Sequence, residues 1–279
     1  MIVVACIGLI FSLLLIVIII FHRKSHTVTN LLLCELCFTA LCFYALHFTG
    51  CYYGTRQNWS ENQPLCTLRA YLLNVTITSA SYSFFIQSIS RLFFTRFYNN
   101  RTWLTWRTHW ILIVVKYLVS FLIAIVPFFY ENGFGLVEGD RMCMITMKTK
   151  AIPFYTLAMS SMLPTIGVIS IYSIILHEIR LVAAKVSPNI DKTPSYRNAK
   201  RNLKILQQLL ILLSILACGA TPYLILCFWN LNSSQRPPDE LYFISLNFVV
   251  LSATIMLTVS VFMNKKVKDS LNNFTRVHI

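Results

Sequence analysis

The sequence predicts an all-α fold: an integral membrane bundle of seven transmembrane helices. Of its 279 residues, 56% are hydrophobic and only 12% are charged, against about 25% charged in soluble domains. Seven apolar runs are close to or above the ~20 residues that cross the hydrocarbon core of a bilayer. Because backbone groups in lipid must bond within their own segment, these runs are expected to be helices.

The expected helices form a single domain over residues 1–279. They cover residues 2–22, 30–50, 67–97, 108–130, 152–179, 202–229 and 240–263. The first is uncharged from Ile2 to Phe21 and is followed by the basic sequence HRK. It has no basic segment before it and no clear small-residue cleavage site, so we expect a retained helix and not a signal peptide.

The remaining helices follow from their uncharged runs. The second and fourth contain one charged residue each, Glu35 and Lys116, and the third is uncharged between Arg69 and Arg91. The last three contain the uncharged runs Ala151–Leu176, Ile205–Trp229 and Leu241–Met263. Each run is long and apolar enough to cross the membrane.

The net charge of +14 sets the orientation. With the N-terminus outside, the inner segments carry 17 of the 24 lysines and arginines, the outer segments, which include Arg69, carry six, and Lys116 lies within a helix. Basic residues favour the cytoplasmic side, so we expect the N-terminus outside and the C-terminus in the cytoplasm. Because the cations occupy short loops and not one face of a polar fold, no nucleic-acid partner is expected.

The segment after the seventh helix, residues 265–275, is expected to form a short amphipathic eighth helix. Val267, Leu271 and Phe274 recur at helical spacing, with basic residues between them. Such a helix would lie on the inner membrane surface, where lysines meet anionic lipid. The alternative is a solvated tail.

Cysteines and sequons mark the outer face. Six of the nine cysteines lie within the expected helices, where cysteine behaves as a small apolar residue. Cys66 and Cys143 fall in outer segments, and a bridge between them would hold the longest outer loop over the bundle. Cys51 is also external, so the pairing stays open. Asn58 (NWS) and Asn232 (NSS) are candidate glycosylation sites.

Several spacings are shared with one receptor family. They are TVTN at 27–30, Trp59 seven residues before Cys66, Arg91 twenty-five residues after it, Tyr172 eight residues after Pro164, Pro222 in the sixth helix, and FMNKKVKDSL at 262–271. The chain resembles, over essentially its whole length, a rhodopsin-like (class A) G protein-coupled receptor. At 1.5 Å per residue, a helix from Cys66 to Arg91 spans about 37 Å, which puts Arg91 near the inner surface.

This resemblance implies a multi-pass receptor of the plasma membrane. Its expected partners are an extracellular ligand, a heterotrimeric G protein and membrane lipid. In the family, the arginine at the position of Arg91 holds the resting state and then meets the G protein, with Tyr172 as its active-state neighbour. Pro222, which cannot donate a backbone hydrogen bond, favours a local break that lets helix 6 move. Pro164 matches the family's helix 5 proline.

The chain also departs from the family pattern. Ser90 and Leu92 replace the acid and tyrosine on either side of the arginine. The other departures are Ser12 in helix 1, Ala40 at the sodium-site aspartate, Tyr117 at the helix 4 tryptophan, Asn202 near the inner end of helix 6, Ala220 at the helix 6 tryptophan and MLTVS in place of Asn-Pro-x-x-Tyr. Two interpretations compete: a divergent receptor with a repacked core, which the intact loop lengths and cysteine positions favour, and a degenerate receptor that no longer signals.

The ligand is not identified by the sequence. Leu73 occupies the position of the carboxylate that binds amines, and no lysine lies in 241–263 for a retinal Schiff base. Acidic residues in the outer loops favour, weakly, a basic peptide. The candidate pocket residues are Leu73, Asn74, Thr78, Tyr223 and Asn247.

Two other protein classes were weighed. An enzyme is not expected, because the six histidines show no His-Glu-x-x-His pattern and Glu35 has no second acid nearby in the sequence. No metal or cofactor is expected either. A transporter would favour inverted repeats and interrupted helices, and no repeat is visible. A multi-pass transporter is therefore less favoured than a receptor and is kept as the alternative membrane class.

Overall fold

The structure is a computed structural model of the chain. It describes residues 2–21, 27–56, 63–97, 101–131, 133–137, 142–147, 150–185, 194–232 and 238–263. Asn58, Trp59 and the expected eighth helix at 265–275 lie outside these residues.

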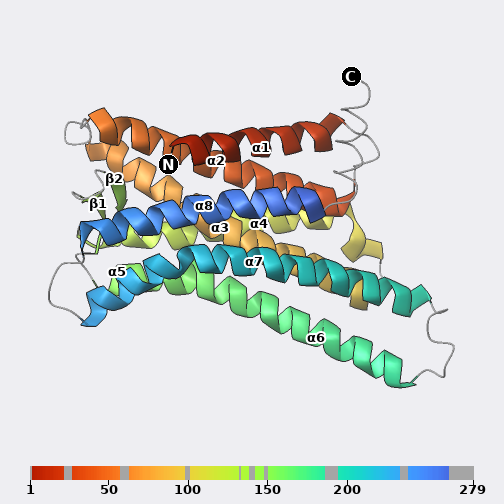
Figure 1. Cartoon of the computed structure of the whole chain (residues 1–279). Coiled ribbons are helices and arrows are strands. Elements are labelled where there is room, and N and C mark those ends of the chain that lie inside the picture. Colours follow the sequence, from red (N-terminus) through yellow and green to blue (C-terminus); the bar gives the residue numbers. More distant parts are fainter. Residues whose placement is uncertain are drawn as a thin grey trace.

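The described part of the chain forms seven long helical segments packed into one bundle (Figure 1). They are α1 (Ile2–Phe21), α2 (Val28–Arg56), α3 (Gln63–Arg96), α4 (Trp106–Ile125), the continuous pair α5 (Ala151–Leu157) and α6 (Leu163–Lys185), α7 (Pro194–Asn232) and α8 (Asp239–Met263). Two 3₁₀ turns, Arg101–Leu104 and Val126–Phe129, flank α4. The predicted seven-helix fold is confirmed.

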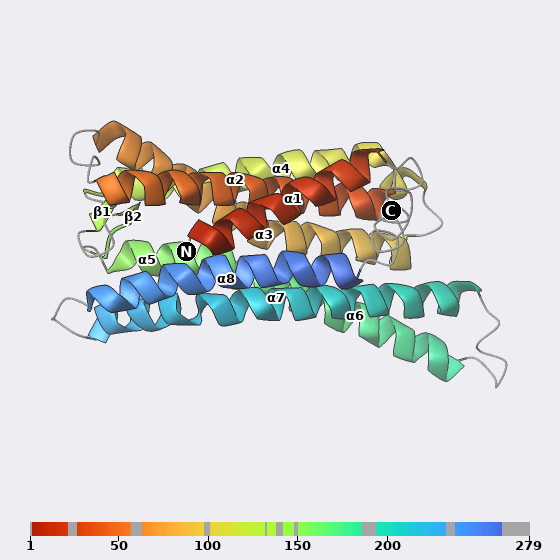
Figure 2. The ribbon, with the colours of Figure 1, turned by 45° about the horizontal axis from the view of Figure 1, so that its top comes forward.

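Successive helical segments run in opposite directions, with α5 and α6 counted as one segment. The α2–α3, α4–α5 and α7–α8 connections meet at one end of the bundle, and α1 runs away from that end (Figures 1 and 2). A two-stranded antiparallel hairpin, β1 (Phe134–Val137) and β2 (Met142–Ile145), lies there. This is the outer end, and α8 ends at the opposite, inner end, as the charge distribution predicts.

Helix α3 is the central helix of the bundle. Six of the seven segments have the length and hydropathy of a membrane span, and α3 is the exception within the described residues. Half of its 34 residues are buried, among them seven serines and threonines. It packs against α2, α4, α6, α7 and both strands. Because protein and not lipid surrounds this helix, it tolerates small polar side chains that would lower its affinity for lipid.

Proline controls the local geometry of the α5–α6 segment. The two helices join through a π-helical turn, Ala158–Met162, and Pro164 follows within the first turn of α6. Proline cannot donate to the carbonyl four residues back, and its ring crowds that carbonyl. The wider turn before it accommodates this defect. Pro222, in contrast, lies inside α7, which continues as a helix on both sides.

A disulfide joins Cys66 near the start of α3 to Cys143 in β2. Cys51 is a free, buried thiol whose Sγ lies 3.6 Å from His47 Nε2. The structure therefore resolves the pairing that the sequence left open. The hairpin is fixed to α3, and Cys51 takes no part in the bridge.

Arg69 strengthens this attachment. Arg69, which belongs to the expected helix 67–97 and was counted with the outer segments for the charge distribution, lies in α3, and only 3% of its surface is exposed. Its Nε donates to the Leu46 carbonyl at 2.9 Å and its Nη1 to the Cys143 carbonyl at 2.8 Å. A Cβ at Gly50 would lie 1.8 Å from Arg69 Nη2, so only glycine allows the guanidinium this close to α2. Two backbone carbonyls thus accept hydrogen bonds from the buried guanidinium and offset part of the cost of removing it from water.

Candidate functional site

Three polar or hollow regions follow one another along α3, from the outer to the inner end of the bundle. They are an outer cavity, a buried ion pair between α2 and α4, and an inner cavity whose lining includes Arg91.

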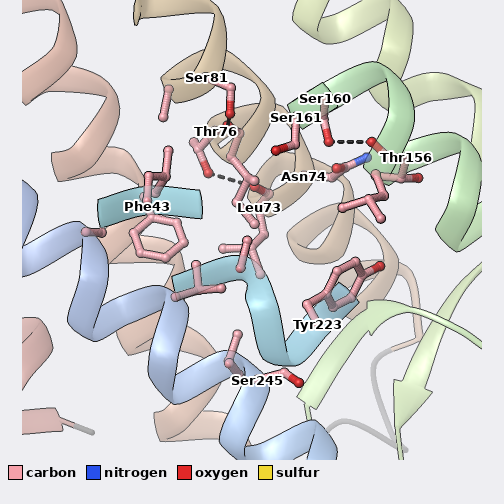
Figure 3. Close-up of a pocket in the computed structure, with 18 of the residues that line it drawn as sticks. Phe43, Leu73, Asn74, Thr76, Ser81, Thr156, Ser160, Ser161, Tyr223 and Ser245 are labelled. Carbon is pink, nitrogen blue, oxygen red and sulfur yellow. Dashed lines mark hydrogen bonds between the residues drawn. The ribbon is translucent and has the colours of Figure 1, made fainter. Parts of the chain in front are cut away.

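The outer cavity has a volume of about 180 Å³ and lies among α2, α3, the α5–α6 segment, α7, α8 and β2 (Figure 3). Its lining is mostly apolar, and the part formed by described residues contains no charged side chain. The polar members are Thr39, Asn74, Thr76, Ser81, Thr156, Ser160, Ser161, Thr165, Tyr223, Tyr242 and Ser245. The cavity can therefore enclose a small molecule of mainly apolar character.

The structure brings three of the five predicted pocket residues to this cavity. Leu73, Asn74 and Tyr223 line it. Thr78 does not, because it is fully buried and lies on α3 away from the lining. Asn247 does not line the cavity either. Its amide donates to the Phe243 carbonyl of its own helix at 2.8 Å.

Asn74 is the polar side chain of greatest interest in the lining. Only 4% of its surface is exposed, and its amide nitrogen has no hydrogen-bond partner among the described residues. Figure 3 shows it beside Thr156 of α5 and Ser160 of the π-helical turn. Ala40 and Ala220 also line the space, at the positions where the resembling family has an aspartate and a tryptophan. Their small side chains leave room that larger residues would fill.

A buried ion pair lies at the level where α2, α3 and α4 meet. Lys116 Nζ of α4 binds Glu35 Oε1 of α2, with 0% and 7% of these side chains exposed. Ser83 of α3 donates to Glu35 Oε2 at 2.9 Å and accepts from Lys116 Nζ at 3.1 Å. Thr39 donates to Glu35 Oε1 at 2.9 Å, and the Lys116 ammonium lies 3.9 Å from the centre of the Tyr117 ring. Such a dense set of partners is what a charge pair needs at membrane depth.

Sequence reasoning identified Glu35 and Lys116 as the charges inside the expected helices but did not pair them. The signal was present: one acid and one base, each isolated in an apolar run, have opposite charges that can neutralise each other. Their separation of 81 residues hid the contact.

Arg91 lies at the inner end of α3, where the sequence predicts it. Its Nη2 donates to Thr29 Oγ1 of α2 at 2.9 Å, and its guanidinium carbon lies 6.0 Å from the centre of the Phe94 ring. Thr29 belongs to the TVTN sequence at 27–30. A threonine hydroxyl of α2 therefore serves as a partner of the arginine.

Ser90 bonds away from Arg91. Its hydroxyl lies 2.9 Å from His109 Nε2 of α4, and His109 Nδ1 lies 2.9 Å from the Thr105 carbonyl. A carbonyl can only accept, so Nδ1 carries the proton and the Ser90 hydroxyl donates to Nε2. Ser90 thus fastens α3 to α4, and the position next to the arginine has a structural role here.

The inner cavity around Arg91 has a volume of about 650 Å³. Its walls come from α2, α3, the 3₁₀ turn Arg101–Leu104, the start of α4, α7 and α8, and its α7 members are Ile205, Gln208, Leu209 and Leu212. Beyond the cavity, Arg96 Nε at the end of α3 lies 3.4 Å from Glu178 Oε1 of α6. Arg91 and Arg96 in the last part of α3 place this cavity and this ion pair near the end of the bundle opposite the hairpin.

The other predicted switch residues lie at a distance from this cavity. Tyr172 is partly buried against the main core and is not in the lining of the inner cavity. Pro164 follows the π turn beside the outer cavity, and Pro222 precedes the cavity residue Tyr223. One turn before Pro222, a Cβ at Gly219 would lie 1.9 Å from Ser252 Oγ, so α7 and α8 touch closely there.

Comparisons with known proteins agree with this architecture. Residues 12–271 match the family described as 7 transmembrane receptor (rhodopsin family). The crystal structure of squid rhodopsin superimposes with a TM-score of 0.79 at 15% sequence identity, over 99% of this chain and 83% of that one. No curated protein matches the sequence.

Proposed function

Because the chain belongs to the rhodopsin family of seven-transmembrane receptors, we propose that it acts at the plasma membrane as a receptor. It binds an extracellular ligand at the outer cavity and activates heterotrimeric G proteins at the inner end. The structural likeness to squid rhodopsin, at 15% identity, supports the fold and not a particular ligand.

The observation that carries this proposal is the place of Arg91. It lines an inner cavity whose opposite wall is α7, the sixth long helical segment of the bundle. Outward movement of the inner half of α7 would widen this cavity and expose the guanidinium to a cytoplasmic partner. The Thr29 hydroxyl that accepts from Arg91 is a neutral group, and a hydrogen bond to it can be exchanged at modest cost.

The sequence of α7 supports such a movement. Pro222 removes one backbone hydrogen bond of this helix. Helices bend most readily at such positions. We propose that Pro222 is the pivot, that Pro164 and the π turn adjust the α5–α6 segment beside it, and that Tyr172 becomes a neighbour of Arg91 in the active state.

The test is a ligand-independent coupling assay across the classes of G protein, with the Arg91→Ala variant. We expect the variant to reach the cell surface and to lose coupling. Arg107→Ala is the matched control, because Arg107 is an exposed arginine near the start of α4. Coupling of Arg91→Ala at the level of the parent chain would overturn the role of this residue.

The same assay separates the alternatives. A receptor that has lost its signalling function would show no coupling to any class, with or without Arg91. A transporter would also fail to couple but would accumulate a substrate. We further propose glycosylation at Asn58 and at Asn232, which is exposed at the end of α7.

A further inference from the structure

We propose that the ligand of the outer cavity is a small, uncharged molecule with an apolar body and one hydrogen-bond acceptor that binds Asn74. This inference rests on the proposed receptor function and names the class of ligand for that site. It is carried by the charge, the hydrogen bonding and the shape of the cavity.

The charge of the cavity excludes an ionic ligand. None of the described residues that line it is charged. The nearby ions already have partners: Arg69 bonds to two backbone carbonyls, and Glu35 and Lys116 neutralise each other. A charged group entering this space would lose its water and gain no counter-ion, which is strongly unfavourable.

The hydrogen bonding of the cavity calls for an acceptor. Most lining hydroxyls with an assigned bond donate to carbonyls of their own helices: Thr76 to Leu73, Ser81 to Ile77, Thr156 to Ile152, Ser160 to Thr156 and Ser245 to Leu241. The Asn74 amide nitrogen has no partner among the described residues. The nitrogen is itself buried, so a ligand acceptor reaches it once the Asn74 side chain turns toward the cavity, and the bond then removes the cost of a buried donor without a partner.

The shape of the cavity fits a compact apolar body. Its volume of about 180 Å³ is below the ~300–1,000 Å³ of sites for drug-sized ligands. Six alanines line it: Ala40, Ala70, Ala80, Ala217, Ala220 and Ala253. Ala40 and Ala220 stand at the positions where the family has larger side chains, so they leave room in the cavity. Most of the lining is apolar, which suits an aliphatic chain.

The experiment uses the full chain, purified into lipid nanodiscs, and three photoreactive probes. Each probe has the same eight-carbon diazirine chain and differs in its head group, which is a primary amide, a carboxylate or an ammonium. Labelled peptides are mapped by mass spectrometry, with excess unlabelled octanamide as competitor. We expect the amide to label the cavity walls of α3 and α7, with competition, at least about tenfold more than either ion.

Two variants locate the binding. Ala220→Trp fills the deep part of the cavity and should abolish the competed labelling, whereas Ile225→Trp, on the exposed face of α7, should preserve it. Asn74→Leu should weaken octanamide competition about tenfold. Because Ala220→Trp risks misfolding, its elution and thermal unfolding are compared with those of Ile225→Trp, and Asn74→Leu gives an independent reading.

The opposing outcomes are distinct. Labelling confined to lipid-facing residues, equal labelling by the ionic probes, or displacement by a basic peptide and not by octanamide would each overturn the inference. No G protein takes part in this experiment. Intact coupling without cavity labelling would therefore reject the ligand class alone, and cavity labelling without any coupling would reject the proposed function alone.

Discussion

Arg91 Nη2 of α3 donates a hydrogen bond to Thr29 Oγ1 of α2 over 2.9 Å. The position before Arg91, an acid in the family, is Ser90, which bonds to His109 instead. A hydrogen bond from a charged donor to a neutral hydroxyl contributes about 1.5–3 kcal/mol. A single substitution of Thr29 therefore removes one of the contacts that hold the arginine in its resting position.

Thr29→Val is expected to raise ligand-independent G protein coupling several-fold. The substitution keeps the shape of the side chain and removes the hydroxyl that holds Arg91, which shifts the population toward the state in which the arginine is free. Basal coupling at equal surface expression measures this. Thr29→Ser, which keeps the hydroxyl, is the control, and similar basal activity in the serine and valine variants would refute the prediction.

The Glu35–Lys116 pair is expected to be required as a pair. Glu35→Leu or Lys116→Met alone leaves a buried, uncompensated charge, which typically costs about 3–5 kcal/mol. We expect each single variant to lose surface expression and thermal stability, and the double variant to recover much of both. Thermal unfolding of the solubilised receptor, arranged as a double-mutant cycle, gives the coupling energy.

Lys204→Met, at an exposed lysine of α7, serves as the control for that cycle. Additive losses in the double variant would mean that the two charges act independently. That result would contradict the contact.

Cys66→Ser is expected to destabilise the receptor by about 2–5 kcal/mol, the usual cost of losing a native disulfide. The bridge and Arg69 together fix the hairpin to α3, so the loss should also weaken ligand binding. Cys51→Ser should leave the unfolding temperature nearly unchanged, because Cys51 is a free thiol. A larger effect at Cys51 than at Cys66 would show that the pairing differs.

Gly219→Ala is expected to lower thermal stability and surface expression. The added Cβ would lie 2.3 Å from Ser252 Cβ, so α7 and α8 would have to separate. Overpacking of this kind typically costs about 1–3 kcal/mol. Ser252→Gly in the same chain removes the clash and should restore part of the loss. Absence of any rescue would point to the Phe248 carbonyl, 3.0 Å from the added Cβ, as the obstacle.

The helices were predictable because their signal is local. An uncharged run of about 20 residues specifies a membrane helix wherever it occurs. Even α3, which is more polar than the other spans, was identified from its lack of charge between Arg69 and Arg91. The cysteines near the start of α3 and in the outer loop were likewise recognisable from position, although the sequence did not exclude Cys51.

The contacts that build the site were not predictable, because they depend on packing between distant segments. Arg69 stood near the start of an expected helix, but the sequence did not show that carbonyls of α2 and β2 allow it to be buried. Lys116 and Glu35 were recognisable as isolated opposite charges, but their separation of 81 residues hid the contact. Asn247 and Thr78 had the right helices but the wrong faces. A rotation of one residue around a helix, about 100°, decides whether a side chain lines a cavity.

The same ion pair bears on how the protein is made. Glu35 precedes Lys116 by 81 residues, so at ~5–20 residues per second the carboxylate is synthesised about 4–16 s before its partner. During that interval Thr39 is available from the same helix, and Ser83 arrives 48 residues after Glu35. The second helix thus enters the bilayer with the Glu35 carboxylate before its cationic partner, Lys116 of the fourth helix, has been synthesised. Final integration of the second helix is therefore expected to await the fourth.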